Sequence, residues 1–66
     1  MPVPKFKVLK TMCKHYDLTP KKVKKIILDN NIINSQNLIE LLEIQHSVYM
    51  DQFHAQYIIS NKEYLY

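Results

Sequence analysis

The chain has 66 residues and a formal net charge of +3, which makes one domain near the lower limit of what folds without disulfides or metals. So short a chain has little surface with which to enclose a reaction pocket, so we expect a binding protein and not an enzyme. It contains no glycine, which excludes glycine-dependent phosphate loops and nucleophile elbows. Its single cysteine, Cys13, cannot form an internal disulfide, and this predicts an intracellular, cytoplasmic protein in a reducing compartment.

The charge is divided unevenly along the chain. Residues 1–28 contain eight lysines and one aspartate, a balance of +7, whereas residues 29–66 contain one lysine and five acidic residues, a balance of −4. A basic segment of this kind is typical of proteins that bind nucleic acid or an anionic surface. Polar residues interrupt every apolar run, so neither a membrane span nor a secretory signal is expected.

The first half of the chain predicts two helices. Two prolines predict an extended arm over residues 1–4. A helix over residues 5–16 then follows from the helical spacing of its apolar residues, which are Leu9, Met12, Cys13 and Tyr16. Thr19 is a good N-cap and Pro20 suits the first helical position, so a second helix is expected over residues 20–29. It buries Val23, Ile26 and Ile27, and Asn30-Asn31 ends it, because asparagine tolerates left-handed backbone.

The second half predicts one long helix over residues 34–60, capped by Asn34 or Ser35. Two apolar stripes on this helix require two partners, and the first two helices can cover only one stripe. A second copy of the chain is the simplest cover for the other, so we expect a homodimer whose interface draws on Leu41, Ile44, Val48, Phe53, Tyr57 and Ile58. Two alternatives remain for residues 57–66, a short C-terminal hairpin or the end of the helix followed by a frayed tail.

Residues 9–28 resemble the helix-turn-helix of DNA-binding proteins. The residues that carry the resemblance are a small residue in the first helix, an apolar residue after the turn and two core anchors in the second helix, namely Cys13, Leu18, Val23 and Ile26. Asp17 stands where the family usually has glycine. The three predicted helices make an all-α fold in a single domain, with a basic, helix-turn-helix-like half over residues 5–31 and the long helix after it. The resemblance implies that the second helix enters the major groove.

The lysines of the second helix oppose its stability. Lys21 and Lys22 lie in the first turn, where the helix dipole disfavours cations by roughly 0.3–1 kcal/mol each, and Lys24 and Lys25 add like-charge neighbours. Anionic phosphates would relieve both conflicts. The candidate nucleic-acid contacts are therefore Thr19, Lys21, Lys22, Lys24, Lys25 and Lys14, together with Lys5 and Lys7 on the arm, which could reach a minor groove.

The side chains that could carry other chemistry are poorly spaced for it. The chain has no close pair such as Cys-x-x-Cys or His-x-x-x-His, so we predict no metal site and no cofactor. Cys13 is expected to be a small buried packing residue.

These observations predict a small DNA-binding protein of helix-turn-helix type, a transcriptional regulator or an accessory factor, with duplex DNA as its partner. The alternative is a protein–protein interaction module, an inhibitor or adaptor. It would dock its Tyr/Ile-rich C-terminal helix on a partner, and its lysines would meet an acidic patch there.

Overall fold

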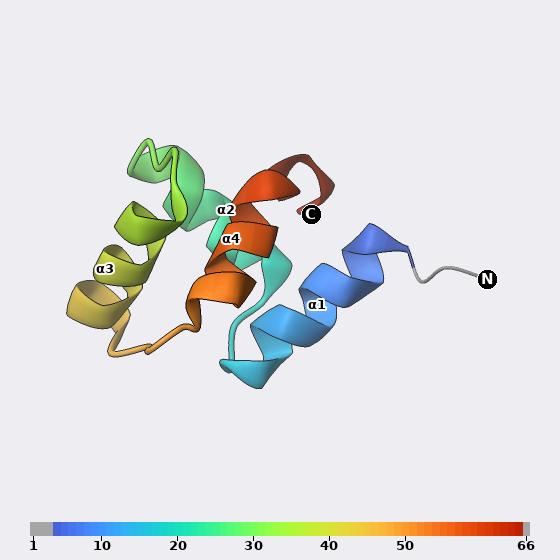
Figure 1. Ribbon diagram of the computed structural model, residues 1–66, viewed down its shortest axis with the longest axis horizontal. Coiled ribbons are helices and arrows are strands. Elements are labelled where there is room, and N and C mark those ends of the chain that lie inside the picture. Colours follow the sequence, from blue (N-terminus) through green and yellow to red (C-terminus); the bar gives the residue numbers. More distant parts are fainter. Residues whose placement is uncertain (1–3, 66) are drawn as a thin grey trace.

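The computed structural model describes residues 4–65. Its elements, in chain order, are α1 (Lys5–His15), α2 (Pro20–Asp29), α3 (Ser35–His46), α4 (Gln52–Ser60) and the 3-10 helix η1 (Lys62–Tyr64) (Figure 1). Residues 4–65 contain no strand, which confirms the all-α class. Of the predicted extended arm, residues 1–3 lie outside the described range.

The ends of α1, α2 and α3 are each followed, within two residues, by a residue other than glycine whose backbone is left-handed. These residues are Asp17 (φ 62°), Asn31 (φ 53°) and Ser47 (φ 55°). At the end of α1 the Leu18 N–H donates to the Cys13 carbonyl at 2.8 Å. At the end of α2 the Ile32 N–H donates to the Ile27 carbonyl at 3.0 Å, and in both cases the two bonded residues are buried. This is the Schellman arrangement, in which a left-handed residue lets the chain return its apolar side chain to the core.

A side chain caps the start of each of the helices α2, α3 and α4. Thr19 Oγ1 accepts from the Lys22 N–H at 3.2 Å, and Asn34 Oδ1 accepts from the Asn37 N–H at 2.8 Å. Asp51 Oδ1 accepts from the Phe53 N–H at 2.8 Å. Such bonds satisfy backbone donors that the helix itself cannot pair. The predicted caps of α2 and α3 are confirmed, whereas the cap of α4 was not foreseen.

The long helix predicted over residues 34–60 is wrong. It is interrupted at residues 47–51, where Ser47 takes left-handed backbone and Asp51 caps a new helix. An unbroken helix of that length would measure about 40 Å, as long as the whole molecule, whose longest extent is 38 Å. The break lets α4 fold back beside α3, so that Leu42 and Ile58 are both fully buried.

The elements pack as neighbouring pairs around one apolar core. α3 lies against α4, α1 lies against α2, and η1 lies against α1. In Figure 1, α3 and α1 occupy opposite ends of the long axis and α4 lies between them. The buried core consists of Leu9, Cys13, Leu18, Val23, Ile26, Ile27, Ile32, Leu38, Leu42, Met50, Ala55, Ile58 and Leu65.

The C-terminal hairpin predicted as one alternative is also wrong over the described residues. The helix ends at Ser60, and the chain then makes a 3-10 turn in which the Tyr64 N–H donates to the Asn61 carbonyl at 3.0 Å. A frayed tail does not follow either, because Leu65 is fully buried and the Asn61 side-chain amide donates to the Tyr57 carbonyl at 2.9 Å. Tyr66 lies outside the described range.

Candidate nucleic-acid interface

The second helix separates an apolar face from a basic face. Pro20 occupies its first turn and is buried, and Val23, Ile26 and Ile27 turn into the core, as predicted. The four lysines of α2 are all exposed: Lys21, Lys22, Lys24 and Lys25. The predicted contact Thr19 is exposed as well, while its hydroxyl caps the helix.

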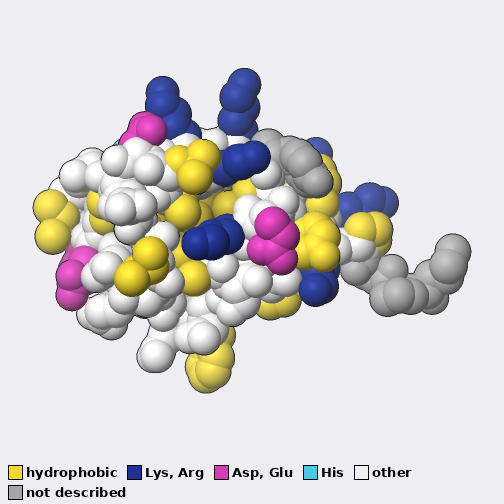
Figure 2. All heavy atoms as spheres, turned by 90° about the horizontal axis from the view of Figure 1, so that it is seen from above, with side chains coloured by type: hydrophobic (Ala, Val, Ile, Leu, Met, Phe, Trp, Pro, Cys, Tyr) yellow, Lys and Arg dark blue, Asp and Glu magenta, His cyan; other side chains and the backbone are white. Residues whose placement is uncertain are grey.

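Neither end of α2 carries the charges that its helix dipole favours. The first turn of α2 contains no acidic residue, and the last turn contains no basic one. Lys21 and Lys22 therefore lie at the positive end of the helix dipole, the arrangement least favourable to α2 itself. Figure 2 shows lysine side chains standing out along one edge of a face, with others in its middle and hydrophobic side chains between them.

Leu28 interrupts this basic face with an apolar side chain. At 100° per residue, position 28 lies between positions 21, 24 and 25 around the helix axis, and Leu28 is 68% exposed. A solvated leucine among lysines can make the apolar contact that a thymine methyl group requires in the major groove. Helix geometry places Leu28 on the basic face from the sequence alone, but sequence reasoning did not select it.

The lysines of α1 divide into two groups. Lys7, Lys10 and Lys14 are exposed on the side away from the buried Leu9 and Cys13, and Lys14 in the last turn suits the negative end of the helix dipole.

Lys5 is held elsewhere, since its ammonium nitrogen lies 5.1 Å from the centre of the Tyr64 ring in a cation–π contact. Lys5 and Lys7 lie in the first turn of α1, which confirms the helix predicted over residues 5–16 at these positions. Their placement on an extended arm that reaches a minor groove is wrong. The helix begins directly after Pro4, whose carbonyl accepts the Lys7 N–H at 3.0 Å and the Val8 N–H at 3.2 Å.

The predicted dimer residues differ widely in their exposure. Ile44 and Phe53 are 79% and 84% exposed, whereas Leu41, Val48 and Tyr57 are partly covered by the chain itself. Ile58 is fully buried, so its place in an interface is a wrong prediction. The fold-back of α4 against α3 buries Ile58 in the core, together with Ala55.

A polar cluster that sequence reasoning missed joins α1 to the start of α4. Tyr16 Oη and His54 Nδ1 lie 2.6 Å apart, and the Asp51 N–H donates to the same Oη at 3.0 Å. The His15 ring meets His54 edge to face, with 6.0 Å between ring centres. Residues 38 positions apart form this bond, so no local pattern could have revealed it. Within residues 4–65, no group of three or more His, Cys, Asp or Glu side chains could hold a metal ion.

Cys13 is fully buried, and burial raises its thiol pKa to about 11. Its thiol is therefore neutral at physiological pH. A neutral thiol suits a buried packing residue, whereas a nucleophilic cysteine has to be a thiolate.

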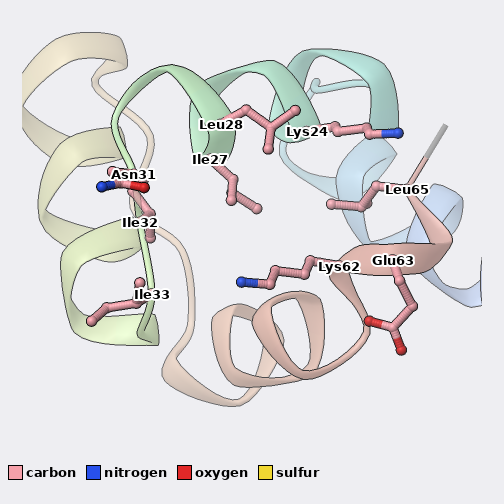
Figure 3. Close-up of a pocket in the computed structure, with 9 residues that line it drawn as sticks. All are labelled: Lys24, Ile27, Leu28, Asn31, Ile32, Ile33, Lys62, Glu63 and Leu65. Atoms are coloured by element: carbon pink, nitrogen blue, oxygen red, sulfur yellow. The ribbon is translucent and has the colours of Figure 1, made fainter.

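A hollow of about 320 Å³ lies beside the basic face, between α2, the loop after it and η1 (Figure 3). Apolar side chains line most of it, and the charged side chains of its lining are Lys24, Lys62 and Glu63. The sequence could not predict it, because it forms where three separate segments meet.

A scan against protein-family models finds no match for this chain, and searches of curated proteins and of solved structures find none. No helix within residues 4–65 is long and apolar enough to cross a membrane.

Proposed function

We propose that this protein binds duplex DNA through the lysines of α2, as a regulator of transcription or an accessory factor. One observation carries the proposal. Four exposed lysines crowd the first six residues of a ten-residue helix, and its first turn contains no acidic residue. Each of these lysines costs the helix free energy through the dipole or through like-charge repulsion. The closely spaced phosphates of a duplex would neutralise these lysines, which removes the repulsion and favours binding.

The turn between α1 and α2 supports the helix-turn-helix reading. Asp17 adopts the left-handed backbone that the family usually assigns to glycine. Leu18 is drawn into the core by its backbone bond to Cys13. This turn fixes the direction in which α2 leaves α1, and it leaves the basic face of α2 exposed.

In the proposed complex the start of α2 enters the major groove. Lys21, Lys24 and Lys25 contact phosphates or guanine edges, and Leu28 meets a thymine methyl group. Lysine acts as a point charge and lacks the two-pronged geometry of arginine. Affinity therefore comes mainly from phosphates, and sequence discrimination is modest.

The test is the affinity for a fluorescently labelled duplex, measured by anisotropy at several salt concentrations. A plot of log affinity against log salt concentration should be linear, with a slope of about −0.9 for each phosphate contacted. An affinity that does not change with salt, or no binding at low salt, contradicts the proposal.

The second candidate function is a protein–protein interaction module. Ile44, Tyr49 and Phe53 favour it, since they are 79%, 74% and 84% exposed on the acidic half of the chain. Exposed aromatic side chains are the usual anchors of protein interfaces. A homodimer through α3 and α4 would use the same residues. DNA binding through α2 and protein interaction through α3 and α4 would then be compatible.

A further inference from the structure

The hollow beside α2 has the composition of a small-molecule site. Its base consists of Ile27, Ile32 and Leu65, which are 4%, 4% and 0% exposed. Leu28 and Ile33 flank its mouth and are 68% and 73% exposed. Large apolar side chains left in water around an apolar base favour an apolar ligand. The volume of about 320 Å³ is at the small end of the range for ligand sites.

Charge decides the rest of the ligand's chemistry. In Figure 3 the Lys62 ammonium points into the hollow, Lys24 extends along the rim from α2, and the Glu63 carboxylate turns away. The lining therefore carries two positive charges and one negative charge, a balance of +1. A ligand with a single negative charge and an apolar body complements it. A phosphate monoester would carry about −1.5 to −2 and would have more charge to desolvate against the apolar base.

We propose that this hollow binds a small carboxylate with an apolar tail, and that this ligand opposes DNA binding. The carboxylate pairs with Lys62, and the tail lies on Ile27 and Ile32 and against Leu28. Lys24 and Leu28 belong both to the hollow and to the basic face of α2. A bound anion therefore lowers the positive potential at Lys24 and covers Leu28, so duplex and ligand compete. Only this competition rests on the proposed function, because ligand binding is measured without DNA.

The first experiment titrates the whole ¹⁵N-labelled chain with octanoate and follows its backbone amides by NMR. The site predicts saturable shifts at Leu28, Ile33 and Leu65, and weaker binding of 1-octanol, which lacks the charge. Absence of saturable shifts, equal binding of 1-octanol, or a general loss of peak dispersion overturns the site.

Two variants with one matched control locate the ligand. Lys62→Glu should weaken octanoate binding about tenfold, since it replaces an attraction by a repulsion, and Ile33→Asp should reduce it similarly. The control is Ile44→Asp, because Ile44 is about as exposed as Ile33 (79% against 73%) and does not line the hollow. Equal effects of Ile33→Asp and Ile44→Asp, or none from Lys62→Glu, contradict the assignment.

The second experiment repeats the DNA titration in the presence of octanoate at constant ionic strength, with acetate as the salt control. Octanoate should weaken duplex binding by the wild-type protein and have about tenfold less potency on Lys62→Glu. If octanoate binds while duplex affinity stays the same, the competition is refuted and the site stands. If the protein binds no DNA, the NMR titration still decides whether the site exists.

Discussion

The hydroxyl of Tyr16 lies 2.6 Å from Nδ1 of His54, and this contact links the end of α1 to the first turn of α4. The same hydroxyl oxygen accepts the Asp51 N–H at 3.0 Å. Tyr16 precedes the turn to α2, and its hydroxyl also bonds to the start of α4, which packs against α3. The basic half and the acidic half of the chain are therefore joined by this contact.

Removing that hydroxyl should destabilise the fold. Tyr16→Phe keeps the ring and leaves the Asp51 N–H and His54 Nδ1 without this partner, which costs about 1–3 kcal/mol in the free energy of unfolding. Urea unfolding followed by circular dichroism measures it. Tyr49→Phe is the control, because Tyr49 is 74% exposed and should change the value by less than about 0.5 kcal/mol. Equal changes in the two variants would show that the contact contributes nothing.

The break between α3 and α4 can be tested at Ser47. Its backbone is left-handed (φ 55°), so Ser47→Gly relieves a steric cost of about 1–2 kcal/mol and should leave stability unchanged or raise it. Gln45→Gly, an exposed position within α3, should cost about 1 kcal/mol. An equal loss in both variants would mean that position 47 is helical and that the long helix exists in solution.

The burial of Cys13 predicts a pH dependence of stability. Its pKa is raised to about 11 in the folded protein, whereas an unfolded thiol ionises near 8.5. The unfolded state therefore releases this proton first as pH rises, so the stabilisation is complete below about pH 8.5 and is lost as pH rises to 11. The loss is at most about 3 kcal/mol.

Thermal or urea unfolding of the wild type and Cys13→Ala at a series of pH values isolates the contribution of Cys13. Every other ionisable side chain is the same in both proteins, so the difference between the two curves belongs to the thiol. The wild type should lose its advantage over Cys13→Ala between pH 8.5 and 11. A difference that stays constant over this range would contradict the burial of the thiol.

The exposed apolar residues of α3 and α4 predict self-association. Sedimentation equilibrium at micromolar concentration should give a dimer, and Phe53→Glu or Ile44→Glu should give a monomer with an unchanged helical spectrum, because both side chains are about four-fifths exposed. Thr11→Glu, an exposed position on α1, should leave the dimer intact. A monomeric wild type would contradict self-association through these residues.

Local signals in the sequence predicted the first half of the fold well and the second half poorly. Thr19 and Pro20 mark a helix start by their own chemistry, and Asp17 and Asn31 tolerate left-handed backbone, so α1, the turn and α2 follow from short-range rules. The apolar repeat of residues 34–60 continues across Ser47, so periodicity alone predicts an unbroken helix. The break depends on α4 finding α3, which is a long-range contact.

The candidate sites differ in the same way. The lysines of α2 could be selected from the sequence because helix geometry fixes which face they occupy. The hollow could not, because Leu28, Ile33 and Lys62 come from three segments that only the folded chain brings together. The buried Ile58 was misassigned to an interface because its apolar stripe looked unpartnered on a continuous helix.

Two double variants with the same loss of charge test DNA binding by α2 most directly. Lys21→Gln/Lys25→Gln changes the basic face of α2, and Lys10→Gln/Lys62→Gln removes two exposed lysines from α1 and η1. The first variant should lower the magnitude of the salt slope by about 1.8, since each lost phosphate contact removes about 0.9, and should weaken duplex binding far more than the second. Equal weakening in both variants would reduce the interaction to a general effect of net charge and contradict DNA recognition by α2.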